Sequence, residues 1–259
     1  MKTGSKSLQR ERKLKQHMKQ TDTNLYMDEY LECERWWVYG LLMFVGAFFG
    51  GFTYSVRGGV FANAQTANFV LMALSAANGN IRKSIYYFIP ISSYLCGIII
   101  SEIVPVYIKK LKFIRWDTLF IFIEIFFVIV LGFIPESAPY EISHIIITFL
   151  AAMQFNTFRQ AQGIPMATTF CTNHLRMMGI LFSKAVRHRD KNYFKRILPH
   201  FAMICVFIVG VYIASVSTKY FFGKAIFITI IPLIILAADL VYADLKKEKG
   251  KLEKIPRGH

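Results

Sequence analysis

The stretch Arg57-Gly58-Gly59-Val60-Phe61-Ala62-Asn63-Ala64-Gln65-Thr66-Ala67-Asn68 places polar side chains inside a long apolar part of the chain. A second stretch of the same kind is Arg159-Gln160-Ala161-Gln162-Gly163-Ile164-Pro165-Met166-Ala167-Thr168-Thr169-Phe170-Cys171-Thr172-Asn173-His174. Each begins with an arginine, passes through a glycine break and leads to Thr-x-Asn or Thr-x-His. Because amides, hydroxyls and imidazoles are costly in hydrocarbon, two such sets indicate a use for them. The two stretches predict a membrane protein with an internal repeat.

The composition also places the chain among helical membrane proteins. Apolar residues make up 54% of the 259 residues, which is more than is typical of soluble domains. The alternating pattern of a transmembrane β-barrel is not visible in the sequence. A spanning helix needs about 17–25 residues. The candidate apolar segments are 36–56, 60–77, 85–108, 118–134, 142–158, 164–182, 197–216 and 222–242.

The positions of lysine and arginine favour one of two topologies, because cytoplasmic loops are enriched in these residues. If every segment spans, the basic loop 109–115 lies outside and the loop 135–141, which has no lysine or arginine, lies inside. If the two motif segments enter the membrane and return to the same side, both loops follow the rule. We therefore expect an all-α polytopic bundle of six spanning helices plus two re-entrant or half-length helices. The second half inverts the first, an arrangement recurrent in transporters.

This topology divides the chain into three parts and sets its location. Residues 1–35 and 243–259 are basic tails, and residues 36–242 form the membrane domain, with repeats 36–134 and 142–242. We expect a multi-pass protein of the cell (plasma) membrane with both termini cytoplasmic. The net charge of +15 sits in loops and tails, so it indicates membrane orientation rather than nucleic-acid binding. The expected partners are the lipid bilayer and a small polar solute, and the chain could also form a homo-oligomer.

The candidate solute path consists of the polar residues of the two motifs. A helix that starts after a glycine break offers N–H groups to a solute, whereas the alternative is that these side chains only join helices by hydrogen bonds. Thr168 and Thr172 lie four apart, as do Thr169 and Asn173, so each pair is predicted to stack along one helix face. Pro165 suits the first turn of that helix. The path residues are Arg57, Asn63, Gln65, Thr66, Asn68, Arg159, Thr168, Thr169, Thr172, Asn173 and His174.

Two carboxylates inside apolar segments, Glu102 and Glu124, are candidates for proton coupling. Pairing with a lysine of the loop 109–115 is the alternative for both. Sequence signatures of the common hydrolases, zinc enzymes and nucleotide-binding proteins do not occur, and the four cysteines form no C-x-x-C pair. We therefore expect no catalytic residue, metal or cofactor.

The two motifs resemble those of the YoaK family of bacterial integral membrane proteins, whose function is not established. The similar parts are Gly46 to Asn68 in the first half, and Gln154 to Arg159, Gly163 to Pro165 and Ala167 to Arg176 in the second. The chain departs from the family pattern where an aspartate becomes Gly50, a glycine becomes Ala67 or Asn173, and an asparagine becomes His174.

Three functions are compatible with these features. The first hypothesis is a permease or channel-like transporter of a small polar solute, with the paired Thr/Asn motifs along its path. The second is a non-transporting membrane scaffold or regulatory partner, in which the motifs only hold the halves together. The third is a membrane enzyme that uses His174 and Glu124.

Overall fold

The computed structural model describes residues 30–111 and 113–258, and these are mostly helical. Most of the predicted amino-terminal tail therefore lies outside the described residues. The helices are α2 (Trp36–Val56), α3 (Gln65–Ala77), α4 (Ile81–Leu111), α5 (Trp116–Phe133), α6 (Tyr140–Thr157), α7 (Thr172–His188), α8 (Asn192–Phe221) and α9 (Ile230–Tyr242). Shorter elements are the 3-10 turns η1 (Glu32–Glu34), η2 (Phe222–Thr229) and η4 (Lys249–Lys251), the π-helical turn η3 (Ala243–Lys247), and the antiparallel strands β1 (Gln160–Ala161) and β2 (Ile164–Pro165).

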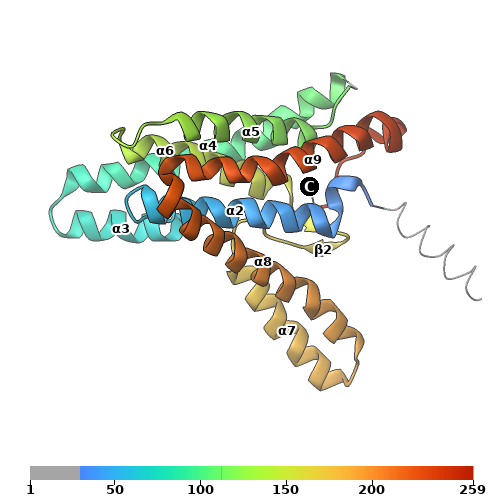
Figure 1. Ribbon diagram of the computed structural model, residues 1–259. Coiled ribbons are helices and arrows are strands. Elements are labelled where there is room, and N and C mark those ends of the chain that lie inside the picture. The colour runs from blue at the N-terminus through green and yellow to red at the C-terminus, as the bar shows by residue number, and fades with distance from the viewer. Residues whose placement is uncertain (1–29, 112, 259) are drawn as a thin grey trace, which may run out of the picture.

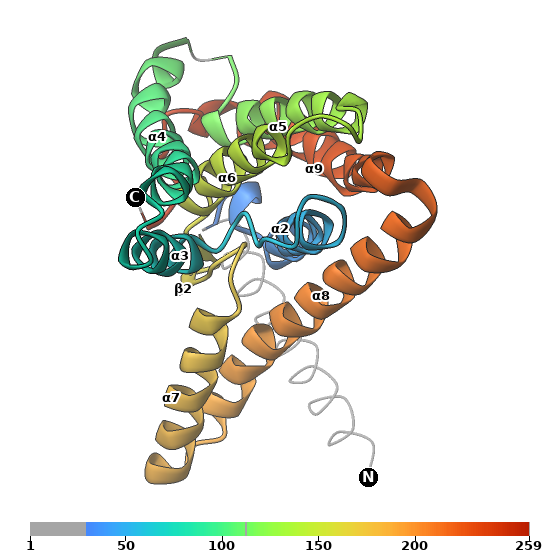
Figure 2. The same ribbon diagram turned by 90° about the vertical axis from the view of Figure 1, so that its left-hand side faces the viewer.

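Helix α2 lies at the centre of the bundle, with α5, α6, α8 and α9 around it (Figures 1 and 2). Most of its side chains from Val38 to Thr53 are buried. The bundle has two ends, which we name by the arginines buried there. Helix α2 runs from the Arg115 end to the Arg57 end, and α5 runs in the same direction. The hairpins α3–α4 and α7–α8 extend beyond the bundle on different sides (Figures 1 and 2).

Two helix crossings depend on glycines that admit a neighbouring backbone. A Cβ atom at Gly97 of α4 would lie 2.7 Å from the carbonyl oxygen of Phe149 on α6. A Cβ atom at Gly210 of α8 would lie 2.8 Å from the carbonyl oxygen of Phe44 on α2. Small residues allow this close approach of helices in a membrane. Helix α4 therefore packs on α6, and α8 packs on α2.

Four segments among the described residues are long and apolar enough to cross a membrane: Trp36–Val56, Ile81–Lys110, Trp116–Phe133 and Asn192–Lys247. The last has 56 residues and would be about 84 Å long as one helix. It reverses instead at Phe222, whose φ is +49°, so that α9 returns toward the Arg115 end (Figure 1).

The segments around the two motifs differ from the expected helices. Helix α3 begins only at Gln65 and α7 only at Thr172, so Thr168 and Thr169 lie in a loop. The predicted stacking of Thr168 on Thr172 and of Thr169 on Asn173 is therefore wrong, and Pro165 lies in a strand. The physical reason is that the loop carbonyl groups accept hydrogen bonds from side chains outside the loop. In a helix they would accept from backbone N–H groups instead.

Candidate functional site

The two motif loops enter the bundle from opposite ends and meet beside α2. The first loop is 57–64 and the second is 158–171. The side-chain Nδ2 of Asn63 donates to the carbonyl oxygen of Thr169 over 3.2 Å. On α2, a Cβ atom at Gly46 would lie 2.7 Å from the carbonyl oxygen of Thr168, and one at Gly50 would lie 3.3 Å from the Asn63 side chain. These two glycines, one helical turn apart, therefore make room for both loops.

The first loop is held by hydrogen bonds around Ala62. The backbone N–H of Ala62 donates to Thr53 Oγ1 on α2 at 3.4 Å. Its carbonyl oxygen accepts from Thr148 Oγ1 on α6 at 2.7 Å and from Gln65 Nε2 at 2.9 Å. Asn68 Nδ2 in turn donates to Gln65 Oε1 at 3.0 Å. The predicted path residues Gln65 and Asn68 thus stabilise the loop and the start of α3.

The second loop is held by Gln154 of α6 and His174 of α7. Gln154 Nε2 donates to the carbonyl oxygens of Leu42 at 3.1 Å and Thr168 at 3.5 Å. The ring Nε2 of His174 lies 2.8 Å from the carbonyl oxygen of Ala167. Residue Gln154 belongs to the resembling segment, but no feature of the sequence places its side chain on this loop.

Several oxygens at this meeting point have no partner among the described residues. They are Thr168 Oγ1, Thr169 Oγ1 and Gln154 Oε1, all buried. Buried side-chain oxygens in proteins are nearly always hydrogen-bonded to protein or water. We call the set Asn63, Gln154, Thr168 and Thr169 the central site. It can accept hydrogen bonds from a small molecule.

The other threonines of the motifs lie elsewhere. Both Thr66 and Thr172 are exposed, so neither belongs to the central site. The buried residues are the ones two positions later, Asn68 and His174, because positions i and i+2 of a helix face different sides. The partly buried Asn173 accepts a hydrogen bond from Arg176 at 3.1 Å.

The two motif arginines are paired with carboxylates at opposite ends of the bundle. At one end, the buried Arg57 pairs through Nη1 with Glu136 Oε2 at 3.0 Å. At the other end, Arg159 pairs with Glu102. Glu102 is therefore paired with a motif arginine. Neither arginine adds a charge to the central site.

Glu124 lies on α5 and is fully buried. Both of its carboxylate oxygens lack a partner among the described residues. Within residues 30–111 and 113–258, no hydrogen bond joins Glu124 to the central site. Its use in proton coupling stays a prediction.

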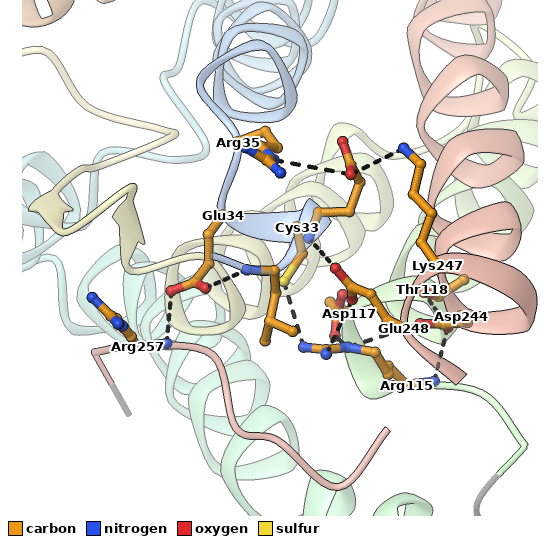
Figure 3. A network of polar contacts seen from close by, with 12 residues as sticks. Cys33, Glu34, Arg35, Arg115, Asp117, Thr118, Asp244, Lys247, Glu248 and Arg257 are labelled. Atoms are coloured by element: carbon orange, nitrogen blue, oxygen red, sulfur yellow. Dashed lines mark hydrogen bonds and ion pairs between the residues drawn. The ribbon is translucent and has the colours of Figure 1, made fainter. Parts of the chain in front are cut away.

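A buried polar network at the Arg115 end was not anticipated from the sequence (Figure 3). The Nε of Arg115 donates to Asp117 Oδ1 at 3.0 Å, and its backbone N–H donates to Asp244 Oδ2 at 3.0 Å. Glu248 Oε2 lies 3.5 Å from Arg115 Nη1, and its other oxygen accepts from the backbone N–H of Glu32 at 2.7 Å. The network joins η1, the start of α5 and the turn after α9.

The same network surrounds Cys33, whose sulfur lies 3.5 Å from Arg115 Nη2. Burial, together with the nearby carboxylate of Asp117, holds the pKa of the Cys33 thiol well above its usual range. Because the thiolate is the reactive form of cysteine, this thiol is a weak nucleophile. Burial thus outweighs the nearby Arg115 guanidinium in its effect on the pKa of this thiol.

Open space near the first loop is small. A cavity of about 20 Å³ lies between this loop, α3, α4 and α6, and its lining includes Ala62, Asn68, Tyr87 and His144. A water molecule needs about 10–15 Å³ of such volume. The cavity therefore has room for about one water molecule, and a larger solute needs the loops to move.

Comparison with known proteins gives a family but no activity. Neither a curated protein nor a solved structure matches the chain. The sequence pattern of DUF1275, described as a protein of unknown function, matches residues 38–238. The resemblance seen in the two motifs is thereby confirmed at the level of an uncharacterised family, whereas the YoaK name is not. Since the match covers most of the chain and both motif loops, the protein belongs to the DUF1275 family of proteins of unknown function.

Proposed function

We propose that this protein is a permease or channel-like transporter of a small polar solute, which passes between the two loops at the central site. The observation that carries the proposal is the set of buried, unpartnered oxygens of Thr168, Thr169 and Gln154 beside the contact between Asn63 and Thr169. Each such oxygen costs about 1–3 kcal/mol when nothing bonds to it. A solute or water that passes through the bundle would offset that cost.

The proposed topology has six spans and two re-entrant segments. The reversal at Phe222 divides Asn192–Lys247 into two crossings, and α6, which packs against α4 at Gly97, is the sixth. Each short helix, α3 and α7, starts beside the central site and runs back toward the end at which its loop entered (Figure 1). Non-helical backbone at membrane depth is tolerated where protein buries it or water reaches it.

An inverted repeat is supported by the matched helix crossings. Gly97 of the first half packs on Phe149 and Ala152 of the second. Gly210 of the second half packs on Phe44 and Ala47 of the first. In the repeat, α4 corresponds to α8 and α6 corresponds to α2. The crossing of α4 on α6 therefore corresponds to the crossing of α8 on α2. In inverted-repeat transporters, the substrate site lies at the interface of the halves near the bilayer midplane, where the two loops of this protein meet.

The proposed location is the cell membrane, with the Arg115 end cytoplasmic. Lysines and arginines gather at this end and at the tip of α7–α8, including Lys109, Lys110, Arg187 and Arg189. The loop at the Arg57 end, residues 134–141, has Glu136 and Glu141 but no basic residue. This distribution follows the positive-inside rule.

The chemistry of the central site favours an uncharged solute. Its side chains are amides and hydroxyls, and the nearby arginines are paired with Glu136 and Glu102. A charged solute in such a place would lack a counter-charge, which is costly at low dielectric. Small alcohols and amides fit the available donors and acceptors.

Flux through proteoliposomes tests the proposal. Purified protein should speed the entry of glycerol or urea, followed by the light scattering of swelling vesicles. Asn63→Ala and Thr169→Val should lower the rate about tenfold, as expected when about 1.4 kcal/mol of barrier stabilisation is lost. The matched control is Thr66→Ala, because Thr66 belongs to the same motif but is exposed.

The scaffold alternative has one observation in its favour. The Asn63–Thr169 and Thr148–Ala62 hydrogen bonds join the two halves, as a purely structural motif would. Under this alternative, Asn63→Ala lowers the thermal stability, and even the unmodified protein gives no flux above that of empty vesicles. That result would reject the transporter proposal.

A further inference from the structure

Two buried histidines lie in contact behind the second loop. The ring nitrogens Nδ1 of His174 on α7 and Nδ1 of His200 on α8 are 3.1 Å apart. The other ring nitrogen of His174, Nε2, lies 2.8 Å from the carbonyl oxygen of Ala167. Nε2 of His200 is buried and has no partner among the described residues. Both side chains are fully buried.

These contacts determine where the protons of the pair lie. A carbonyl oxygen only accepts, so Nε2 of His174 carries a hydrogen. In a neutral His174, Nδ1 is then an acceptor, and the hydrogen between the rings belongs to Nδ1 of His200. A neutral His200 therefore has no hydrogen on Nε2. His200 therefore donates to His174, and His174 donates to Ala167. At the start of this series, the buried Nε2 of His200 carries no hydrogen and has a free lone pair.

We propose that His174 and His200 form a single proton-binding site, at Nε2 of His200, that couples proton binding to movement of the second loop. A proton taken from water forms a bond with the Nε2 lone pair, and the pair changes from neutral to singly positive. The proton returns to water on release. Both existing hydrogen bonds remain, because neither uses this lone pair. The coupling to solute flux rests on the transporter function proposed above, whereas the proton site does not.

The site is linked directly to the central site. Ala167, which accepts the hydrogen bond from His174, precedes Thr168 and Thr169. Hydrogen bonds from a positively charged donor are shorter and stronger than neutral ones. The positive charge on His200 strengthens its hydrogen bond to His174, and the polarised His174 ring in turn donates more strongly to Ala167. Protonation of the pair therefore strengthens the hold of α7 on the second loop. Release of the proton weakens it, so the two states bias the loop differently.

Among the described residues, no hydrogen bond joins a charged side chain to either histidine. Helix α2, which packs on α8, has no charged residue from Trp36 to Val56, and its titratable side chains are Tyr39 and Tyr54. The loop residues 166–171 carry only Cys171. The charged or titratable residues of α7, α8 and η2 other than the pair are Arg176, Lys184, Arg187, His188, Tyr193, Lys195, Arg196, Cys205, Tyr212, Lys219, Tyr220 and Lys224, and each is exposed or half-buried.

Nitrogen NMR of the protein in lipid bilayers tests the proton site without any solute. With ¹⁵N-labelled histidine at neutral pH, we expect His174 protonated on Nε2 and His200 on Nδ1, with a coupling between the two Nδ1 nuclei across the shared hydrogen. On acidification, one proton should enter the pair at His200 Nε2, with both rings responding together. His200→Gln and His188→Gln assign the signals, and His188 is the matched control because it is exposed at the tip of α7.

Two results would overturn the proton site. One is a His200 protonated on Nε2 at neutral pH with no shared hydrogen. The other is independent titration of the two rings. Sequential assignment of the unmodified protein also identifies both rings, so misfolding of His200→Gln would not obscure either result.

Flux measurements test the coupling. An inward proton gradient should stimulate entry of the solute that passes the glycerol and urea test, and His174→Gln or His200→Gln should abolish the stimulation while His188→Gln retains it. Flux that is indifferent to the gradient rejects the coupling but leaves the transporter proposal standing. If no solute moves at all, the transporter proposal fails and the coupling with it, and the NMR result still decides the proton site.

Discussion

At the scale of single residues, Gly46 and Gly50 matter because they face the two loops. Their spacing also suits close packing of two helices, yet a Cβ atom at either glycine would meet Thr168 or Asn63 of the loops. The neighbour of Gly46 is backbone, which cannot rotate away as a side chain could. Any side chain at this position therefore displaces the second loop.

Replacement of Gly46 tests this arrangement. Gly46→Ala should lower the stability by about 1–3 kcal/mol, as overpacking does in protein cores, and it should also slow solute flux. The measurement is thermal unfolding of purified protein in detergent. Gly40→Ala is the control, because Gly40 lies on the same helix and a Cβ atom there would have no neighbour within 4 Å. Equal melting temperatures for the two variants would contradict the close contact.

The residues of the central site were only partly predictable. The sequence led us to Asn63, Thr168 and Thr169 because polar residues are rare in apolar surroundings. It did not indicate Gln154, which reaches the second loop from α6 only through tertiary packing. Nor did it indicate His200, which packs against His174 behind that loop. Thr66 and Thr172 were included because of their motif position, but the helix turns them outward.

At the scale of elements, the Arg115 network holds the Arg115 end of the bundle together. Its members come from η1, α5 and the segment after α9 (Figure 3). Glu34 of η1 extends the network to the carboxyl-terminal segment, since its Oε1 accepts from the backbone N–H of Arg257 at 2.9 Å. The backbone at Arg257 is thus fastened to the bundle.

Removal of the guanidinium should release that segment. Arg115→Met leaves Asp117, Asp244 and Glu248 without their shared cation, and breaking a buried ion pair costs about 3–5 kcal/mol. We expect a lower melting temperature and faster proteolysis of residues 249–258. Arg187→Met, at an exposed arginine of α7, is the control. If the two variants are cleaved at the same rate, the network does not hold the carboxyl-terminal segment.

At the scale of the whole molecule, the proposed inverted repeat makes a definite prediction about sidedness. The tips of the two hairpins, at Asn80 and Arg189, must lie on opposite sides of the membrane. So must Lys110, in the last turn of α4, and Ser137, after α5. Eight full spans would instead place Asn80 inside and Lys110 outside.

Labelling of single cysteines with a membrane-impermeant maleimide tests this topology. In a chain whose four native cysteines are replaced, cysteine at Asn80 or Ser137 should react in intact cells. Cysteine at Lys110 or Arg189 should react only after the cells are made permeable. The physical reason is the excess of basic residues at the Arg115 end. Reaction of Lys110 in intact cells, with Asn80 protected, would exclude the inverted topology.

The sequence by itself determined the helical class, the apolar segments and the two polar interruptions, because length, hydropathy and glycine breaks act locally. Tertiary structure alone decided where α7 begins, which motif side chains are buried, and which residues join at the Arg115 end. In each of these cases the partner that satisfies a buried polar group comes from a distant part of the chain: Asn63 binds Thr169, His200 lies against His174, and Asp244 binds Arg115. A buried hydrogen bond is selected by packing in space, and no local pattern of residues specifies it.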